Sequence, residues 1–123
     1  MSKLVLVIED DPDQRRLLER MLVGGGWRVV TATDGASGLG AAKNQPPDAI
    51  VLDVMMPRLN GYQTCRQLKA DPATMAIPVI MCTSKDQPAD QYWATEVGAD
   101  AFLAKPVDIT RLVQMLERLT EAQ

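Results

Sequence analysis

An apolar run that ends in one carboxylate constrains the fold of this chain more than any other feature. Within residues 50–57, three aliphatic residues lead directly into Asp53, and a proline closes the segment. Short β-branched and aliphatic runs are typical of strands that are buried on both faces of a parallel sheet. Ligands bind at the carboxyl ends of strands in such sheets, so Asp53 is predicted to stand where an acid serves chemistry rather than packing.

Length, composition and charge limit the class of protein. The chain has 123 residues, of which 46% are hydrophobic and 24% charged, as is ordinary for a globular domain. We therefore expect a single domain over residues 1–123, without a separate output domain. The formal net charge of −3 comes without any lysine or arginine run, so direct nucleic-acid binding is not expected.

The N-terminus and the rarer residue types exclude further classes. The apolar stretch after Lys3 is too short for a signal peptide and leads at once into acids, which predicts a cytoplasmic protein without membrane insertion. Cys65 and Cys82 lack metal-binding spacing and are expected to stay reduced. The absence of histidine excludes a Ser-His or Cys-His catalytic pair, a histidine-ligated zinc and a phosphohistidine on this chain.

Strand-like and helix-like segments alternate five times along the chain. Apolar runs predict strands at 4–8, 27–33, 50–53, 78–83 and 101–104. Amphipathic periodicity and capping residues predict helices over 12–23, 35–44, 62–70 and 89–97 and after Asp108. This alternation implies a doubly wound α/β fold with a five-stranded parallel sheet in the order 2-1-3-4-5.

That strand order brings the chemically active side chains to one edge of the sheet. Glu9 and Asp10 end the first strand, and Asp53 ends the third, on the two sides of the switch point. Three carboxylates in a partly dehydrated cleft repel each other unless a cation is present, and an all-oxygen site suits magnesium. Thr83 and Lys105 end the fourth and fifth strands, adding a hydroxyl and a positive charge. Each residue alone could be a capping or surface residue, but together they favour a binding site.

These residues together resemble the receiver domain of two-component response regulators. The matching motifs are Glu9-Asp10, Asp53 followed by Met-Met-Pro and Asn60-Gly61, Thr83-Ser84, and Lys105-Pro106. The resemblance covers the whole chain and implies a flavodoxin-like, CheY-like (βα)5 fold. Within the family, residues 83–87 with Trp93 and Gly98 are most similar to small single-domain regulators of chemotaxis-like systems that control type IV pili and twitching motility.

The resemblance implies a role for each matched residue. Asp53 would be the phosphoacceptor, Thr83 would hydrogen-bond the phosphoryl group, and Lys105 would form an ion pair with it. The implied magnesium ligands are Asp10, Asp53 and the backbone carbonyl of Met55, with Glu9 acting mainly through water.

The resemblance also implies a switch and an output face. Phe102 occupies the aromatic switch position and would fill the space left when Thr83 moves toward the phosphoryl group. The peptide bond before Pro106 would be cis. The output face would be formed by the fourth helix, the fifth strand and the fifth helix, and includes Tyr92, Trp93, Val97, Phe102 and residues 107–116.

The predicted function is a stand-alone response regulator that is not itself an enzyme. It would receive a phosphoryl group from a histidine kinase and signal by binding a downstream protein, as a monomer or weak dimer. A phosphate sink for a shared kinase and an unphosphorylated scaffold are the alternatives. An aspartyl-phosphate hydrolase is disfavoured, because it would carry an acid where this chain has Met55. Met55 and Lys85 stand where the chemotaxis prototype of the family carries an amide and an acid, and since neither is a good base, we expect slower loss of the phosphoryl group by hydrolysis than in that prototype.

Overall fold

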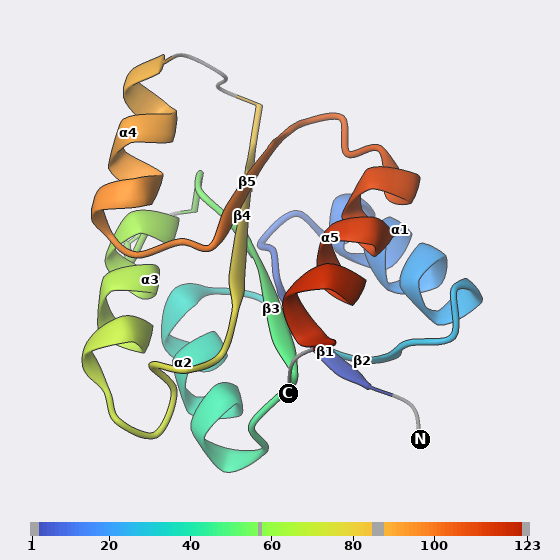
Figure 1. Cartoon of the computed structure of the whole chain (residues 1–123), viewed down its shortest axis with the longest axis horizontal. Helices are drawn as coiled ribbons and strands as arrows, with labels where there is room; N and C mark the ends of the chain where they lie inside the picture. The colour runs from blue at the N-terminus through green and yellow to red at the C-terminus, as the bar shows by residue number, and fades with distance from the viewer. Residues whose placement is uncertain (1–2, 57, 85–87, 122–123) are drawn as a thin grey trace.

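Strands and helices alternate along the whole chain in the computed structural model, which describes residues 3–56, 58–84 and 88–121 (Figure 1). The strands are β1 (Leu4–Ile8), β2 (Arg28–Ala32), β3 (Ala49–Asp53), β4 (Val79–Thr83) and β5 (Ala101–Ala104). The helices are α1 (Pro12–Gly24), α2 (Gly35–Asn44), α3 (Gly61–Ala70), α4 (Pro88–Glu96) and α5 (Ile109–Thr120). The predicted elements are all present, with ends that differ by one residue in most cases.

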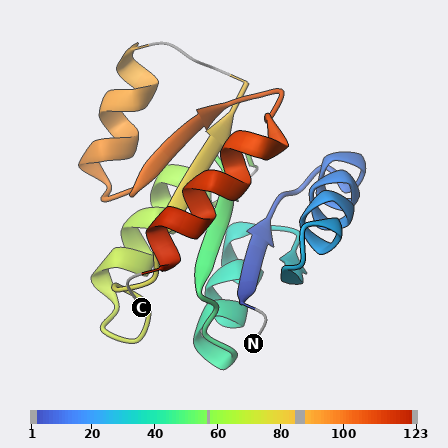
Figure 2. The same ribbon diagram turned by 45° about the vertical axis from the view of Figure 1, so that its right-hand side comes forward.

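The strands form one parallel sheet in the order β2-β1-β3-β4-β5, which confirms the predicted topology. Helices α1 and α5 cover one face of the sheet, and α2, α3 and α4 cover the other (Figures 1 and 2). The strand order reverses between β1 and β3, so the switch point lies at the carboxyl ends of these two strands.

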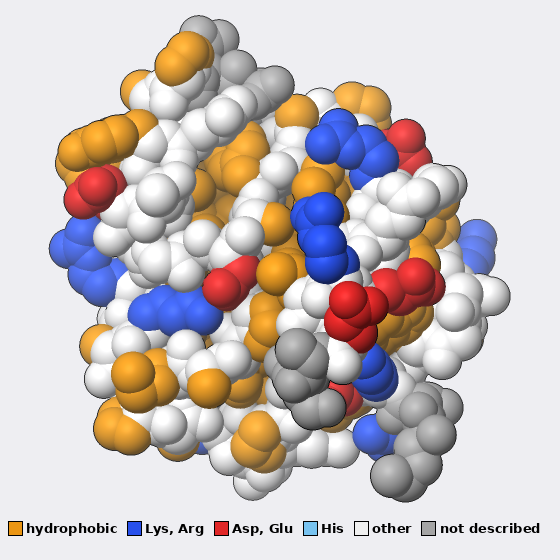
Figure 3. Space-filling view, in the orientation of Figure 1, with side chains coloured by type: hydrophobic (Ala, Val, Ile, Leu, Met, Phe, Trp, Pro, Cys, Tyr) orange, Lys and Arg blue, Asp and Glu red, His pale blue; other side chains and the backbone are white. Residues whose placement is uncertain are grey.

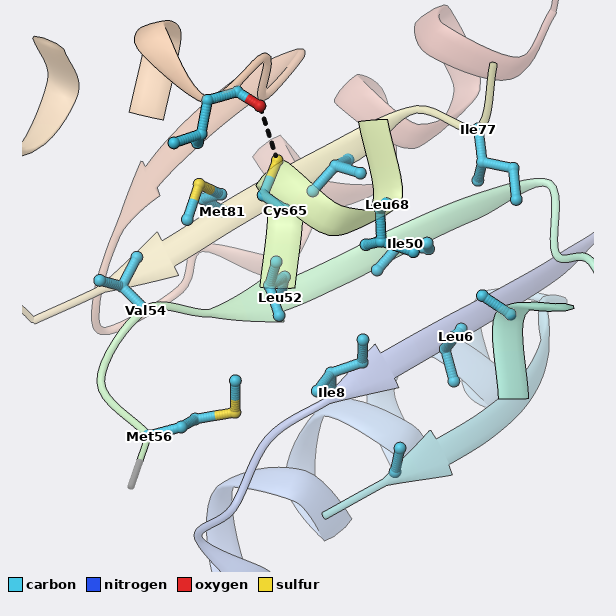
Figure 4. Packing of buried hydrophobic residues seen from close by; sticks show 14 of the residues in the cluster. Leu6, Ile8, Ile50, Leu52, Val54, Met56, Cys65, Leu68, Ile77 and Met81 are labelled. Carbon is cyan, nitrogen blue, oxygen red and sulfur yellow. Dashed lines mark hydrogen bonds between the residues drawn. The ribbon is translucent and has the colours of Figure 1, made fainter. Parts of the chain in front are cut away.

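Two apolar cores form because side chains alternate across the central strands. Leu6 and Ile8 of β1 belong to the core covered by α2, α3 and α4, while Val5 and Val7 belong to the core covered by α1 and α5. Figure 4 shows the first of these cores, in which Leu52 and Leu68 lie between β3 and α3. All residues of β1, β3 and β4 are buried, which explains why their sequences are continuous apolar runs rather than alternating ones.

The first residue of α3 lies directly against the end of β3. The backbone N–H of Gly61 donates to the carbonyl of Val54 at 2.9 Å. A Cβ at position 61 would collide with the backbone of Asp53 and Val54. The glycine therefore lets the loop after Asp53 turn back tightly, and this close approach fixes the end of β3.

Gly61→Ala is expected to lower the free energy of unfolding by about 2–3 kcal/mol, because the backbone of β3 cannot move aside cheaply. Gly40 is the matched control, since a Cβ built there meets no atom within 4 Å. Gly40→Ala in α2 should instead raise the free energy of unfolding by roughly 0.5–1 kcal/mol. Urea denaturation measures both changes. Equal effects of the two substitutions would show that the contact at Gly61 carries no constraint.

No helix in the described part of the chain is long and apolar enough to cross a membrane.

Candidate functional site

The carboxyl edge of the sheet gathers the predicted site residues. Asp53 ends β3 beside Cys82 of β4, and Thr83 ends β4 beside Ala104, the last residue of β5. Lys105 follows β5 directly, and its backbone N–H donates to the carbonyl of Thr83 at 2.8 Å. Three adjacent strands therefore deliver a carboxylate, a hydroxyl and an ammonium to one place, as the sequence predicted.

Three acidic side chains meet at the same edge. Glu9, Asp10 and Asp53 each offer a carboxylate oxygen, and these oxygens lie within 4.8 Å of one another. Glu9 is 2% exposed and Asp53 is 5% exposed, whereas Asp10 is partly exposed. Such a cluster is costly without compensating positive charge. An all-oxygen donor set with one solvent-facing acid fits a hard divalent cation such as magnesium.

Lys105 supplies positive charge to this cluster. Its ammonium Nζ lies 2.7 Å from Oε1 of Glu9 and 3.0 Å from Oδ1 of Asp53. The side chain of Lys105 is only 14% exposed, so both ion pairs are largely shielded from water. Burial alone would lower the pKa of Lys105, but the hydrogen bonds to Glu9 and Asp53 outweigh it and raise that pKa. Lys105 is therefore firmly held in its charged form.

Glu9 is the member of the cluster whose charged form is disfavoured. The pKa of its carboxyl group is raised from 4.5 to about 7, chiefly by burial and also by the negative charge of Asp53, and the contact with Lys105 offsets only part of this rise. Both carboxylate oxygens are engaged, because the backbone N–H of Asp11 donates to Oε2 at 3.2 Å while Lys105 contacts Oε1. The indirect role of Glu9 at a metal ion stays a prediction.

The raised pKa of Glu9 predicts a pH dependence for the metal-free protein. The folded chain binds this proton more tightly than the unfolded chain, so the contribution of Glu9 to stability is fully present below pH 4.5 and is lost as the pH rises through about 7. The expected loss is roughly 1–3 kcal/mol over that interval. Urea denaturation in EDTA at several pH values measures it. Glu9→Gln cannot titrate and should lack this part of the slope; an identical slope in wild type and variant would contradict the assignment.

The loop between β1 and α1 is held by the protein's own side chains. Arg15 Nη1 donates to the carbonyl of Glu9 at 3.1 Å and to that of Asp10 at 3.4 Å. Asp11 caps α1 by accepting a hydrogen bond from the backbone N–H of Gln14, and Pro12 occupies the first turn of the helix. The two acids before the helix are thereby fixed in place before any ligand binds.

The remaining predicted site residues lie close to this edge. Thr83 is fully buried, and Phe102 on β5 is half-buried beside Met81 of β4. The peptide bond between Lys105 and Pro106 is cis, as predicted. The side chain of Met55 is 49% exposed on the loop after β3. Metal binding through the Met55 carbonyl and switching by Thr83 and Phe102 stay predictions. Lys85 lies outside the described residues.

Three residues of the predicted output face lie in the core instead, namely Val97, Leu112 and Leu116. Val97 is only 5% exposed and belongs to the core, where its carbonyl accepts a hydrogen bond from Cys65 Sγ at 3.5 Å (Figure 4). It follows the last residue of α4 and points inward, so it cannot contact a partner in this conformation. Tyr92 and Trp93 are 58% and 51% exposed, with their rings edge to face at 5.5 Å. Figure 3 shows hydrophobic side chains exposed over α4.

One contact of the site was missed by the sequence analysis. Gln14 Oε1 accepts a hydrogen bond from Lys105 Nζ at 2.6 Å, which ties α1 to the far end of the chain. The available signal was the spacing of Asp11 and Gln14, which is that of a helix capping box. That spacing predicts a local contact for Gln14, whereas its partner is 91 residues away in the sequence.

Comparisons with known proteins agree with this geometry. The family model of the response regulator receiver domain matches residues 5–117. Protein PilH of Pseudomonas aeruginosa is 40% identical over 91% of this chain and 93% of its own length. Response regulator PleD of Caulobacter vibrioides is 42% identical over 98% of this chain, which spans only 26% of PleD.

A solved structure extends the comparison to the site. The receiver domain of sensor histidine kinase PA1611 from Pseudomonas aeruginosa matches with a TM-score of 0.91 and 30% identity, over 98% of this chain and 99% of that one. That structure holds a magnesium ion coordinated in its active site cleft. The acidic cluster of Glu9, Asp10 and Asp53 is compatible with such an ion.

Proposed function

This chain belongs to the response regulator receiver domain family, and we propose that it accepts a phosphoryl group on Asp53 from a histidine kinase in a magnesium-dependent reaction in the cytoplasm. The observation that carries the proposal is the position of Asp53, which is buried at the switch point beside Lys105 and the carboxylates of Glu9 and Asp10. A structural acid would need no such cluster of like charges around it.

The chemistry follows from the side chains of the site. A carboxylate oxygen of Asp53 attacks the phosphorus of a phosphohistidine as the phosphorus–nitrogen bond breaks. The imidazole leaves with the electron pair of that bond, and Asp53 becomes an acyl phosphate. No proton needs to be removed from the nucleophile, which agrees with a site that holds no histidine. Lys105, already in contact with Asp53, neutralises charge on the phosphoryl oxygens.

The acids of the site would hold the metal ion. Asp10 and Asp53 would bind magnesium directly with the Met55 carbonyl, and Glu9 would act through water. A bound magnesium ion would neutralise negative charge where the phosphoryl group arrives. A negatively charged donor could then approach Asp53 even though the site already contains three acids.

Signalling would follow from the new charge on Asp53. The Thr83 hydroxyl would donate to a phosphoryl oxygen, and Phe102 would move into the space that this creates. The change would reach the face formed by α4, β5 and α5, to which a downstream protein binds. The chain acts as a regulator rather than an enzyme in this scheme. The similarity to PilH supports a place in the chemotaxis-like systems of pilus motility.

Tryptophan fluorescence tests whether phosphorylation is passed to that face. The chain has two tryptophans, of which Trp27 is 8% exposed beside α1 and α5, and Trp93 is 51% exposed on α4. In Trp27→Phe, the remaining Trp93 is expected to change its emission when acetyl phosphate and magnesium are added. In Trp93→Phe, the emission of the remaining Trp27 reports on general tightening of the core. Asp53→Asn is the second control, because it removes the phosphoacceptor. Phosphorylation without any change at Trp93 would favour a phosphate sink over a messenger.

A further inference from the structure

The first turn of α1 departs from the reciprocal capping box that α2 and α3 form. In α3, Asn60 Oδ1 accepts from the backbone of Gln63, and Gln63 Oε1 accepts from the backbone of Asn60, both at 2.9 Å. Helix α2 closes the same reciprocal pair through Asp34 and Ser37. In such a box the third helical residue satisfies the N–H of the capping residue.

Helix α1 has the sequence of a capping box but only half of its hydrogen bonds. Gln14 donates its backbone N–H to Asp11 Oδ2 at 3.0 Å, as a box requires. The backbone N–H of Asp11, however, donates to Glu9 Oε2 at 3.2 Å. The amide oxygen of Gln14 is thereby released from its local role, and it accepts from Lys105 Nζ at 2.6 Å instead.

This contact completes the hydrogen bonding of the Lys105 ammonium. An ammonium carries three N–H donors, and the three acceptors around Lys105 are Glu9 Oε1 at 2.7 Å, Asp53 Oδ1 at 3.0 Å and Gln14 Oε1 at 2.6 Å. Two of the acceptors are buried acids, and the third comes from an exposed helix turn. Gln14 thus holds Lys105 from the solvent side without adding a fourth carboxylate to the cluster.

We infer that Gln14 is a positioning residue for Lys105. By holding the ammonium group, Gln14 aims at the incoming phosphoryl oxygen the N–H that donates to Asp53 in this structure. The inference rests on the proposed function for its chemical consequence, though not for the contact itself. With Gln14 and Glu9 each taking one donor, only the third N–H can turn from Asp53 to a phosphoryl group. Without Gln14, the N–H that donates to it also lacks a fixed partner, and the ammonium group can adopt more than one orientation.

Two substitutions of Gln14 and one of Gln63 test the inference. Gln14→Met keeps the length of the side chain and removes the acceptor, while Gln14→Glu keeps the acceptor and adds charge. Gln63→Met is the matched control, because it breaks the complete capping box of α3 without touching Lys105. Two measurements apply to each protein. One is the exchange rate of the Lys105 ammonium protons by ¹⁵N NMR, and the other is the rate of phosphorylation as a function of acetyl phosphate concentration.

Gln14→Met is expected to exchange its Lys105 ammonium protons roughly tenfold faster and to show a roughly tenfold lower maximal rate of phosphorylation. The half-saturating donor concentration should stay unchanged. Gln14→Glu should restore the maximal rate to within about twofold while raising the half-saturating concentration, because its charge repels the anionic donor. Gln63→Met should change neither measurement.

Wild-type ammonium exchange in Gln14→Met would overturn the inference, as would an equal loss of rate in Gln63→Met. If the wild-type protein takes no phosphoryl group at all, the proposed function fails instead. The ammonium exchange then decides on its own whether Gln14 holds Lys105, since it needs no phosphorylation.

Discussion

Lys105→Met is expected to slow the phosphorylation of Asp53 by acetyl phosphate by about a hundredfold or more. Lys105 is the cationic side chain that contacts Asp53 within the described residues, and it does so at 3.0 Å with little exposure to water. Charge that develops on the phosphoryl oxygens would lose this partner. A preorganised donor in a shielded site typically accounts for roughly two to three orders of magnitude in rate. Mass spectrometry of the intact protein over time gives the rate at a fixed magnesium concentration.

The control for Lys105→Met is Lys43→Met on α2. Lys43 forms an ion pair with Asp71 at 2.9 Å, but its side chain is 54% exposed and lies outside the acidic cluster. Its loss should leave the rate unchanged and alter stability by less than about 1 kcal/mol. Circular dichroism confirms that both variants are folded before their rates are compared. Equal phosphorylation rates in the two variants would remove Lys105 from the mechanism.

The fold could be predicted because the residue composition of the strands reflects their burial. The runs that became β1, β3 and β4 are continuous, apolar and short, which is typical of strands covered on both faces. Alternation with amphipathic segments then leaves a parallel sheet as the one arrangement with short connections. The acids and Lys105 converge because they follow these strands directly, so placing the strands also placed the site.

The details that failed came from the family resemblance and from capping spacing. Val97 was assigned to the output face by resemblance, but it lies three residues after the buried Ala94, on the side of α4 that packs on the core. Gln14 has the spacing of a capping-box residue, which would accept from the backbone N–H of Asp11. That N–H donates to Glu9 instead. Its actual partner, Lys105, becomes adjacent only when β5 docks beside β4.

Phosphorylation is expected to require both magnesium and the carboxylate of Asp53. The carboxylate oxygens of Glu9, Asp10 and Asp53 lie within 4.8 Å of one another, and Lys105 is one positive charge set against three acids. A negatively charged donor would approach this site against net repulsion in EDTA, so the adduct should form at a small fraction of its rate with magnesium. Asp53→Asn removes the nucleophile while keeping the shape of the side chain. It should abolish the adduct even when magnesium is present.

The mass of the intact protein after incubation with acetyl phosphate and magnesium is the most direct test of this account. Wild type, wild type in EDTA and Asp53→Asn are compared under otherwise identical conditions. The account predicts a single phosphoryl adduct in the wild type with magnesium, and none in Asp53→Asn. A folded wild-type protein without an adduct, or an equal adduct in Asp53→Asn, would contradict the assignment of Asp53 as the phosphoacceptor.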